Sequence, residues 1–80
     1  MKEYIGTFHT HLSALMTCRK LTALGASARM MPVPRKLSSS CGTCVVYQAD
    51  DPHLEIMDED VEGVYLVTGR EQYAMVMENN

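Results

Sequence analysis

The strongest constraint on the fold is a helical segment that lies between two strand-like segments near the start of the chain. Residues 2–8 alternate loosely between apolar and polar side chains, and residues 26–31 form a second short run, so both predict strands. Residues 11–24 show helical spacing, with Thr10 as a typical N-cap and Gly25 as a typical residue after the helix. The apolar face of this helix is expected to hold Ala14, Leu15, Cys18 and Leu21.

The rest of the chain adds three strands and room for one short helix. Strands are predicted at 44–49, 61–67 and 73–77, while 52–59 can hold only one or two helical turns. The order β-α-β-β-α-β-β indicates an α+β fold, a ferredoxin-like split βαβ sandwich with an extra C-terminal edge strand. Because the chain has 80 residues, we expect a single ferredoxin-like domain over 1–80.

The strand directions in this plan bring two distant segments together. The first strand and the third are expected to lie side by side and to run in opposite directions. The turn that holds His9 and His11 should therefore lie at the same end of the sheet as the loop 38–44. The N-terminus of the helix, where the dipole is positive, should lie at that end as well.

The connection 32–43 is longer than a hairpin in a compact domain needs. Long ordered loops often carry function, and a tolerated insertion is the alternative. Its centre contains Ser38, Ser39, Ser40 and Gly42 and has no apolar periodicity. The backbone N–H groups and hydroxyls of such a segment can form an anion-binding nest, or the segment can be a flexible polar loop.

Cys41 and Cys44 form a C-x-x-C motif at the end of this loop. In thioredoxin-like proteins this motif opens a helix, which activates the first thiol, but here it opens a strand. The neighbouring helix N-terminus, with Arg35 and Lys36, could act in its place. We expect Cys41 to be the most reactive thiol, Cys44 to be slower, and Cys18 to react last as a small core residue.

His9, His11, Cys41 and Cys44 together offer the ligand types that Zn²⁺ prefers. Structural zinc sites usually need two knuckles of standard spacing, however, and the two histidines can point apart. We therefore expect no bound metal and keep a Cys₂His₂ metal-binding module as an alternative.

Charge and composition limit the classes of partner. The net charge is −3, which argues against nucleic-acid binding. No apolar run approaches the ~20 residues of a membrane span or resembles a signal peptide, and three cysteines do not make a complete disulfide framework. A cytoplasmic protein with free thiols is expected. Residues 1–49 carry +5 and residues 50–80 carry −8, which indicates either two solvated faces or a basic rim that attracts an anion or acidic partner.

Residues 31–42, MPVPRKLSSSCG, resemble a small bacterial domain family known as selenium/sulfur carrier protein-like. Thr7, Phe8 and His11, with Val64 and Tyr65, support the resemblance, which runs over most of residues 3–67. The resemblance implies a carrier role. It also implies that Cys41 is the carrier cysteine and that Arg35, Ser40 and Gly42 surround it.

We therefore expect a carrier that accepts sulfur or selenium on Cys41 as a persulfide or selenylsulfide and passes it on. A thiolate is the competent nucleophile for this exchange. The chain shows no cofactor motif and no general base at suitable spacing, so a carrier is favoured over a standalone enzyme. Donor and acceptor proteins for sulfur or selenium are the expected partners. A dithiol redox protein that uses Cys41 and Cys44 remains the second alternative.

Overall fold

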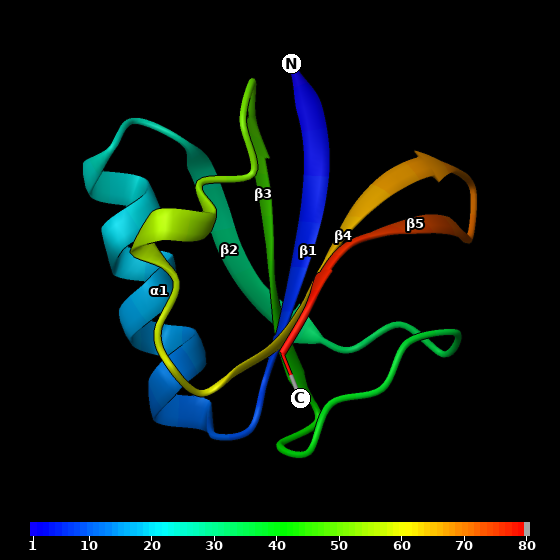
Figure 1. Ribbon diagram of the computed structural model, residues 1–80, viewed down its shortest axis with the longest axis horizontal. Coiled ribbons are helices and arrows are strands. Elements are labelled where there is room, and N and C mark those ends of the chain that lie inside the picture. Colours follow the sequence, from blue (N-terminus) through cyan, green and yellow to red (C-terminus); the bar gives the residue numbers. More distant parts are fainter. Residues whose placement is uncertain (80) are drawn as a thin grey trace.

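The computed structural model describes residues 1–79 and contains a five-stranded sheet, one α-helix and one short 3₁₀ turn. Figure 1 shows α1 on one side of the sheet and the long loop between β2 and β3 on the other. All five predicted strands are present, with ends within two residues of the prediction. The bounds are β1 Lys2–Phe8, α1 His11–Ala23, β2 Ser27–Pro32, β3 Thr43–Ala49, η1 Leu54–Ile56, β4 Val61–Gly69 and β5 Gln72–Glu78.

The strands are arranged in the order β2-β3-β1-β4-β5, and each neighbouring pair is antiparallel. β1 therefore pairs with β3 and β5 forms an edge beside β4, as predicted. Thr7 near the end of β1 lies opposite Cys44 near the start of β3. The turn after β1 and the loop before β3 consequently share one end of the sheet, which confirms the predicted neighbourhood.

Helix α1 begins and ends where its sequence signals predicted. The Thr10 hydroxyl accepts a hydrogen bond from the Ser13 N–H at 3.1 Å, which satisfies one free donor of the first turn. Gly25 follows the helix with a φ of 92°, a conformation that suits glycine. In the part of the chain that the structure describes, no helix has the length and apolar character to cross a lipid bilayer.

The buried face of α1 differs in part from the prediction. Ala14 and Leu21 are buried as expected, but Leu15 and Cys18 are only partly buried. Ser13 and Thr17 are buried instead. Small side chains at these positions allow the helix to lie close to the sheet, whereas Leu15 remains partly exposed.

The second helix expected of the ferredoxin-like plan is absent. Only η1 interrupts the eleven residues between β3 and β4, and His53 before it has a left-handed φ of 55°. A helix of eleven residues would be about 16 Å long, shorter than the roughly 23 Å of a seven-residue strand that it must run back along. The segment therefore crosses in a largely extended form. The α+β class is confirmed, whereas the predicted two-helix sandwich is wrong.

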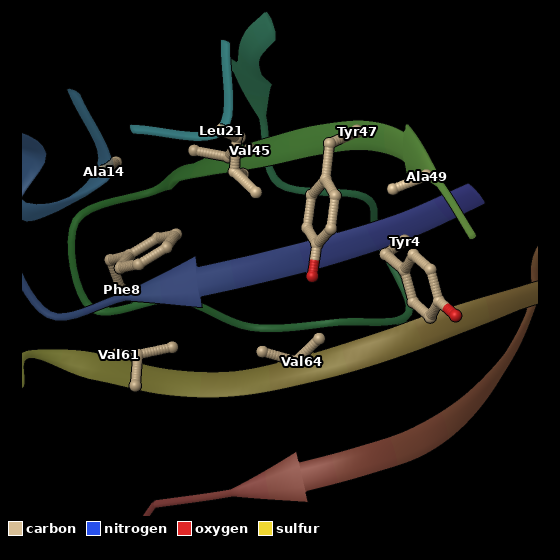
Figure 2. Close-up of a cluster of buried hydrophobic side chains, with 9 residues drawn as sticks. All are labelled: Tyr4, Phe8, Ala14, Leu21, Val45, Tyr47, Ala49, Val61 and Val64. Atoms are coloured by element: carbon tan, nitrogen blue, oxygen red, sulfur yellow. The ribbon is translucent and has the colours of Figure 1, made fainter. Parts of the chain in front are cut away.

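The main hydrophobic cluster lies between α1 and the sheet (Figure 2). Phe8 and Val45 from the sheet and Leu21 from the helix are fully buried there. The rings of Tyr4 and Tyr47 stack with their centroids 5.3 Å apart. The Tyr47 hydroxyl donates to the Pro52 carbonyl at 2.6 Å, so this ring also anchors the segment after β3.

A second, smaller cluster lies on the helix-free face of the sheet. Its buried members are Ile5, Cys44 and Val46, and side chains of the sheet alternate between the two faces. Val33 and Leu37, from the loop between β2 and β3, pack against this cluster. The loop thus takes part in the core while it carries Cys41.

Candidate functional site

The loop between β2 and β3 is ordered by backbone hydrogen bonds at its base and within it. Val33 N–H donates to the Gly42 carbonyl at 3.1 Å, which continues the pairing of β2 with β3. Leu37 N–H donates to Pro34 O at 3.0 Å and Gly42 N–H donates to Ser39 O at 3.1 Å, so each bond closes a four-residue turn. Gly42 has a left-handed φ of 74°, which a glycine adopts without strain.

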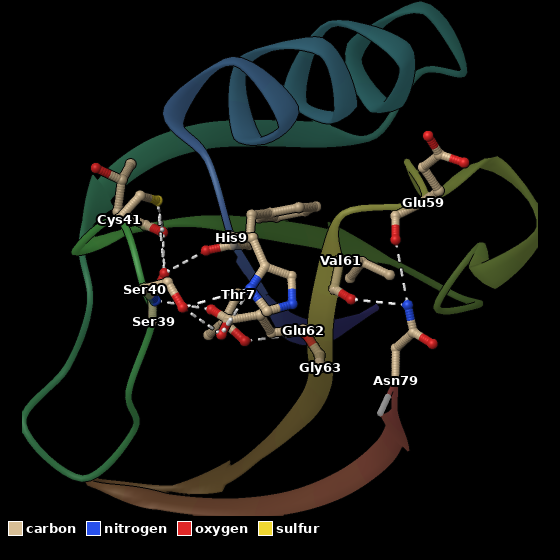
Figure 3. Close-up of polar contacts among 12 residues, drawn as sticks. Thr7, His9, Ser39, Ser40, Cys41, Glu59, Val61, Glu62, Gly63 and Asn79 are labelled. Carbon is tan, nitrogen blue, oxygen red and sulfur yellow. Dashed lines mark hydrogen bonds and ion pairs between the residues drawn. The ribbon is translucent and has the colours of Figure 1, made fainter.

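The Ser39 hydroxyl fastens the loop to the sheet and contacts the Cys41 thiol. Its oxygen lies 2.8 Å from Phe8 O and 3.1 Å from Thr43 O, and its single proton can be donated to one of them at a time. Cys41 Sγ lies 3.5 Å from Ser39 Oγ and 3.5 Å from Thr43 O. Figure 3 shows the partly exposed thiol directed toward Ser39. Cys41 therefore has a hydroxyl and a carbonyl as polar partners.

Glu62 of β4 binds the next residue of the loop, Ser40, with both carboxylate oxygens. Ser40 N–H donates to Oε1 and the Ser40 hydroxyl donates to Oε2, each at 2.8 Å. The His9 ring joins them, since Nδ1 lies 3.3 Å from Glu62 Oε2 and 3.4 Å from Ser40 Oγ (Figure 3). The loop between β2 and β3, here called the serine loop for residues 38–40, thus binds an anionic group, and this group belongs to the same chain.

A β-bulge directs Glu62 toward the loop. In the pairing of β1 with β4, Thr7 lies opposite Gly63 and Phe8 lies opposite Val61, so Glu62 has no opposite residue. Bulges interrupt the alternation of a strand and commonly re-aim one side chain.

The surroundings of Glu62 favour its charged form. Burial raises the pKa of the carboxyl group. The hydrogen bonds from the backbone and side chain of Ser40 lower this pKa, as do the charge of His9 and the Ser39 hydroxyl, and together they outweigh the effect of burial. The resulting pKa lies below the ordinary value of 4.5. Glu62 is therefore a carboxylate at neutral pH and a good acceptor for both Ser40 donors.

The other two cysteines have apolar surroundings. Cys44 is fully buried in the second cluster, with Sγ 3.8 Å from Pro32 O. Burial, and then the charge of Cys41, raises the pKa of Cys44 to about 11. Cys18 is partly buried against the main cluster, and burial raises its pKa too. All three cysteines are free, and Cys41 is the one that combines exposure with polar contacts.

A sequence model of the family described as "Putative Se/S carrier protein-like" matches residues 3–59, well over half of the chain. The chain belongs to this family. The match to the Se/S carrier-like family includes the whole loop and Cys41, and it ends three residues before Glu62.

The Uncharacterized protein YtiA of Escherichia coli (strain K12) is 36% identical to this Se/S carrier-like chain over 45 residues. The alignment covers 56% of this chain and 53% of YtiA, so the chain spans about half the length of the curated relative it matches. No solved structure gives a significant match.

The structure brings together part of the site predicted for this Se/S carrier-like chain. His9, Ser39, Ser40 and Cys41 gather at the end of β1, and Gly42 closes the turn beside them. Ser38 lies at the edge of the group, where it lines a hollow of about 330 Å³ with His9 and Glu62.

Three other residues expected near Cys41 form no hydrogen bond or ion pair with it within residues 1–79. Arg35 and Lys36 line a different hollow with Glu71 and Tyr73, and neither forms an ion pair within residues 1–79. His11 is exposed on α1 and has no hydrogen bond to the loop in the described part of the chain. The contacts of Cys41 therefore come from a serine hydroxyl and a backbone carbonyl, and the expected basic pair is not among them.

The four residues of the Cys₂His₂ alternative do not form a ligand cluster. Among residues 1–79, no group of three or more His, Cys, Asp or Glu side chains is arranged to hold a metal ion. Cys44 is enclosed by the second cluster and His11 is exposed on the helix. A site made of these four residues would need the start of β3 to be rebuilt.

Glu62 is the member of the site that sequence reasoning missed. It lies in a predicted strand, where strict alternation puts it on the same face as Val64. Val64 is fully buried, and a carboxylate cannot share that face without a partner. This conflict in the pattern is the signal of a bulge, and it could have identified Glu62.

Proposed function

We propose that this chain is a carrier that accepts sulfur or selenium on Cys41 and passes it to an acceptor. The contrast between its thiols supports this proposal most directly: Cys41 is partly exposed among polar groups, whereas Cys44 is fully buried. Membership in the Se/S carrier-like family agrees with it.

Loading requires a donor that brings sulfane sulfur, such as a persulfide R–S–S–H. Cys41 Sγ attacks the outer sulfur, a new S–S bond forms, and the S–S bond of the donor breaks. The R–S group leaves with the electron pair and takes up the proton that Cys41 loses, so Cys41 ends as a persulfide and the donor as a thiol. A selenylsulfide R–S–Se–H would load Cys41 in the same way, and transfer to an acceptor thiol reverses these bond changes.

Ser39 is proposed to stabilise the negative charge that forms on Cys41 Sγ when the thiol loses its proton. In the resting site the Cys41 thiol donates a hydrogen bond to Thr43 O, while the Ser39 hydroxyl is closest to Phe8 O. A rotation of this hydroxyl would direct its proton to Sγ, 3.5 Å away, as the thiolate forms. Hydrogen bonds to ionised acceptors are the stronger kind, so the rotation would favour the thiolate.

In the dithiol alternative, Cys44 reacts after Cys41 has been loaded. Cys44 would attack the inner sulfur of a Cys41 persulfide, form a disulfide and release hydrogen sulfide. The burial of Cys44 and its pKa of about 11 oppose this attack at neutral pH. We therefore propose a single-cysteine carrier that works without a bound cofactor, between donor and acceptor proteins, in the cytoplasm, where thiols stay reduced.

Anaerobic incubation with cysteine persulfide, followed by intact mass measurement, tests the carrier function. Wild type and Cys44→Ser are expected to gain about 32 mass units, and Cys41→Ser is not. Cys18→Ser is the matched control and should load as wild type does. Loading that survives in Cys41→Ser would overturn the proposal. A loss of about 2 mass units in wild type that is absent from Cys44→Ser would favour the dithiol reaction instead.

A further inference from the structure

The Glu62 carboxylate occupies the position of a ligand on the loop. Its two oxygens accept from two donors of one residue, the Ser40 N–H and the Ser40 hydroxyl, both at 2.8 Å. Both bonds lie at the exposed surface. A backbone N–H and a hydroxyl that point at one anionic group are the usual elements of an oxyanion site in a protein.

Other groups around Ser40 suit an anion as well. The His9 ring nitrogen lies 3.4 Å from Ser40 Oγ and 3.3 Å from Glu62 Oε2. Helix α1 begins at His11, so the positive end of its dipole lies at the same end of the sheet. The first turn of α1 contains no acidic residue that would compete with an anion at this end of the helix.

Space for an outside ligand adjoins the carboxylate. A hollow of about 330 Å³ is lined by Glu62, His9, Ser38 and Tyr65, with Glu78 also lining it. Glu62 both lines this hollow and binds Ser40, so a ligand that enters the hollow can contact the carboxylate that holds the two donors. Glu62 itself comes from a bulge of β4 rather than from the loop, so the carboxylate and the two donors can separate without any change inside the loop.

We propose that the Ser40 N–H, the Ser40 hydroxyl and the His9 ring form a binding site for a tetrahedral oxyanion, and that Glu62 occupies this site until such an anion displaces it. The site lies one residue from Cys41. If the carrier function proposed above holds, the oxyanion is a sulfate-like or phosphate-like group on the molecule that meets Cys41. Displacement of Glu62 frees Ser40 from β4 while Ser39 still holds the loop to Phe8.

Binding of sulfate to ¹⁵N-labelled protein tests the site without sulfur transfer. All variants are made in a Cys41→Ser background, which cannot carry sulfur, and are titrated with sodium sulfate or with sodium chloride at equal ionic strength. In Glu62→Ala, sulfate should shift the Ser40 amide signal saturably, with a dissociation constant at least tenfold lower than in the Glu62 protein. Chloride should not reproduce the shift.

Glu78→Ala is the matched control, because it removes the same charge from the same hollow, and Glu78 forms no hydrogen bond with Ser40 within residues 1–79. It should not gain affinity for sulfate. A folded Glu62→Ala protein without a saturable shift at Ser40, or an equal gain in Glu78→Ala, would overturn the proposal.

If Glu62→Ala does not fold, Glu62→Gln takes its place. It keeps an acceptor for the Ser40 N–H but loses the charge, and should bind sulfate several-fold more tightly than the Glu62 protein. No gain in a folded Glu62→Gln protein would overturn the site as well. Because Cys41→Ser is present throughout, the oxyanion site and the carrier function can each fail without the other.

Discussion

Glu62 holds Ser40 through both oxygens of its carboxylate, and this pair ties the loop that carries Cys41 to β4. Ser39 ties the same loop to β1 through Phe8 O, and the Val33–Gly42 hydrogen bond closes its base. Three separate attachments therefore set the position of Cys41, and side-chain substitutions can remove two of them one at a time.

The Glu62 attachment predicts a loss of stability in acid. The pKa of Glu62 is lower in the folded protein than its ordinary value of 4.5, so its contribution is fully present above pH 4.5. It is lost as the pH falls through the folded pKa. Urea unfolding between about pH 6 and pH 3 should therefore show a smaller decline in unfolding free energy for Glu62→Gln than for wild type.

Glu59→Gln provides the control for this series. It removes the same charge from an exposed side chain that has no hydrogen bond to the loop. The unfolding free energy of Glu59→Gln should decline as the pH falls, to the same extent as that of wild type. A Glu62→Gln curve parallel to that of wild type would show that the carboxylate contributes nothing to stability through its charge.

The Ser39 attachment predicts that replacing Ser39 lowers the stability of the protein, whereas replacing the neighbouring Ser38 does not. Ser39→Ala removes the hydroxyl that donates to Phe8 O at 2.8 Å and should lower the unfolding free energy by about 1 kcal/mol. Ser38→Ala changes an exposed serine whose side chain has no hydrogen bond within residues 1–79, and should stay within about 0.5 kcal/mol of wild type. Equal urea midpoints for the two variants would contradict this role of Ser39.

The surroundings of the three cysteines predict their order of alkylation. The sequence favoured Cys18 as the slowest thiol, but the structure buries Cys44 completely and Cys18 only in part. With a pKa of about 11, Cys44 is ionised to only about one part in a thousand at pH 8. Peptide mass analysis after timed iodoacetamide treatment should give Cys41 first, Cys18 second and Cys44 last. Early modification of Cys44 would mean that the loop opens readily in solution.

We expect the Thr10 N-cap to make a measurable contribution to the unfolding free energy through α1. Thr10→Ala leaves the Ser13 N–H without its acceptor and should cost about 1 kcal/mol of unfolding free energy. Thr22→Ala removes an exposed threonine near the other end of α1, whose hydroxyl donates to Cys18 O within the helix, and should cost less than about 0.5 kcal/mol. Circular dichroism with urea unfolding measures both.

Local signals in the sequence predicted most of the elements. Thr10 and Gly25 bound the helix because capping depends on a few adjacent residues, and the alternation in residues 2–8 depends only on which side chains face the core. The predicted pairing of β1 with β3 then placed His9 beside the serine loop. These features follow from short-range geometry and from the rules of strand connection.

The remaining features depend on contacts that no local pattern records. The missing second helix reflects the length of chain available between β3 and β4, which matters only once both strands have their places. Glu62 reaches Ser40 through a bulge, and bulges arise from the pairing of two strands rather than from either strand alone. Arg35 and Lys36 are close to Cys41 in sequence, but the turn at 34–37 places them beside the β4–β5 hairpin.

The packing of Val33 and Leu37 on the helix-free face bears on how the carrier would work. A cysteine on a long flexible segment can move from one partner to the next. Cys41 cannot do so, because its loop is packed against the second hydrophobic cluster. In the proposed relay the whole domain therefore has to move, and it must present the same end of its sheet first to the donor and then to the acceptor. A donor and an acceptor that both use this end would compete for it, so this relay predicts that the carrier leaves the first before it meets the second.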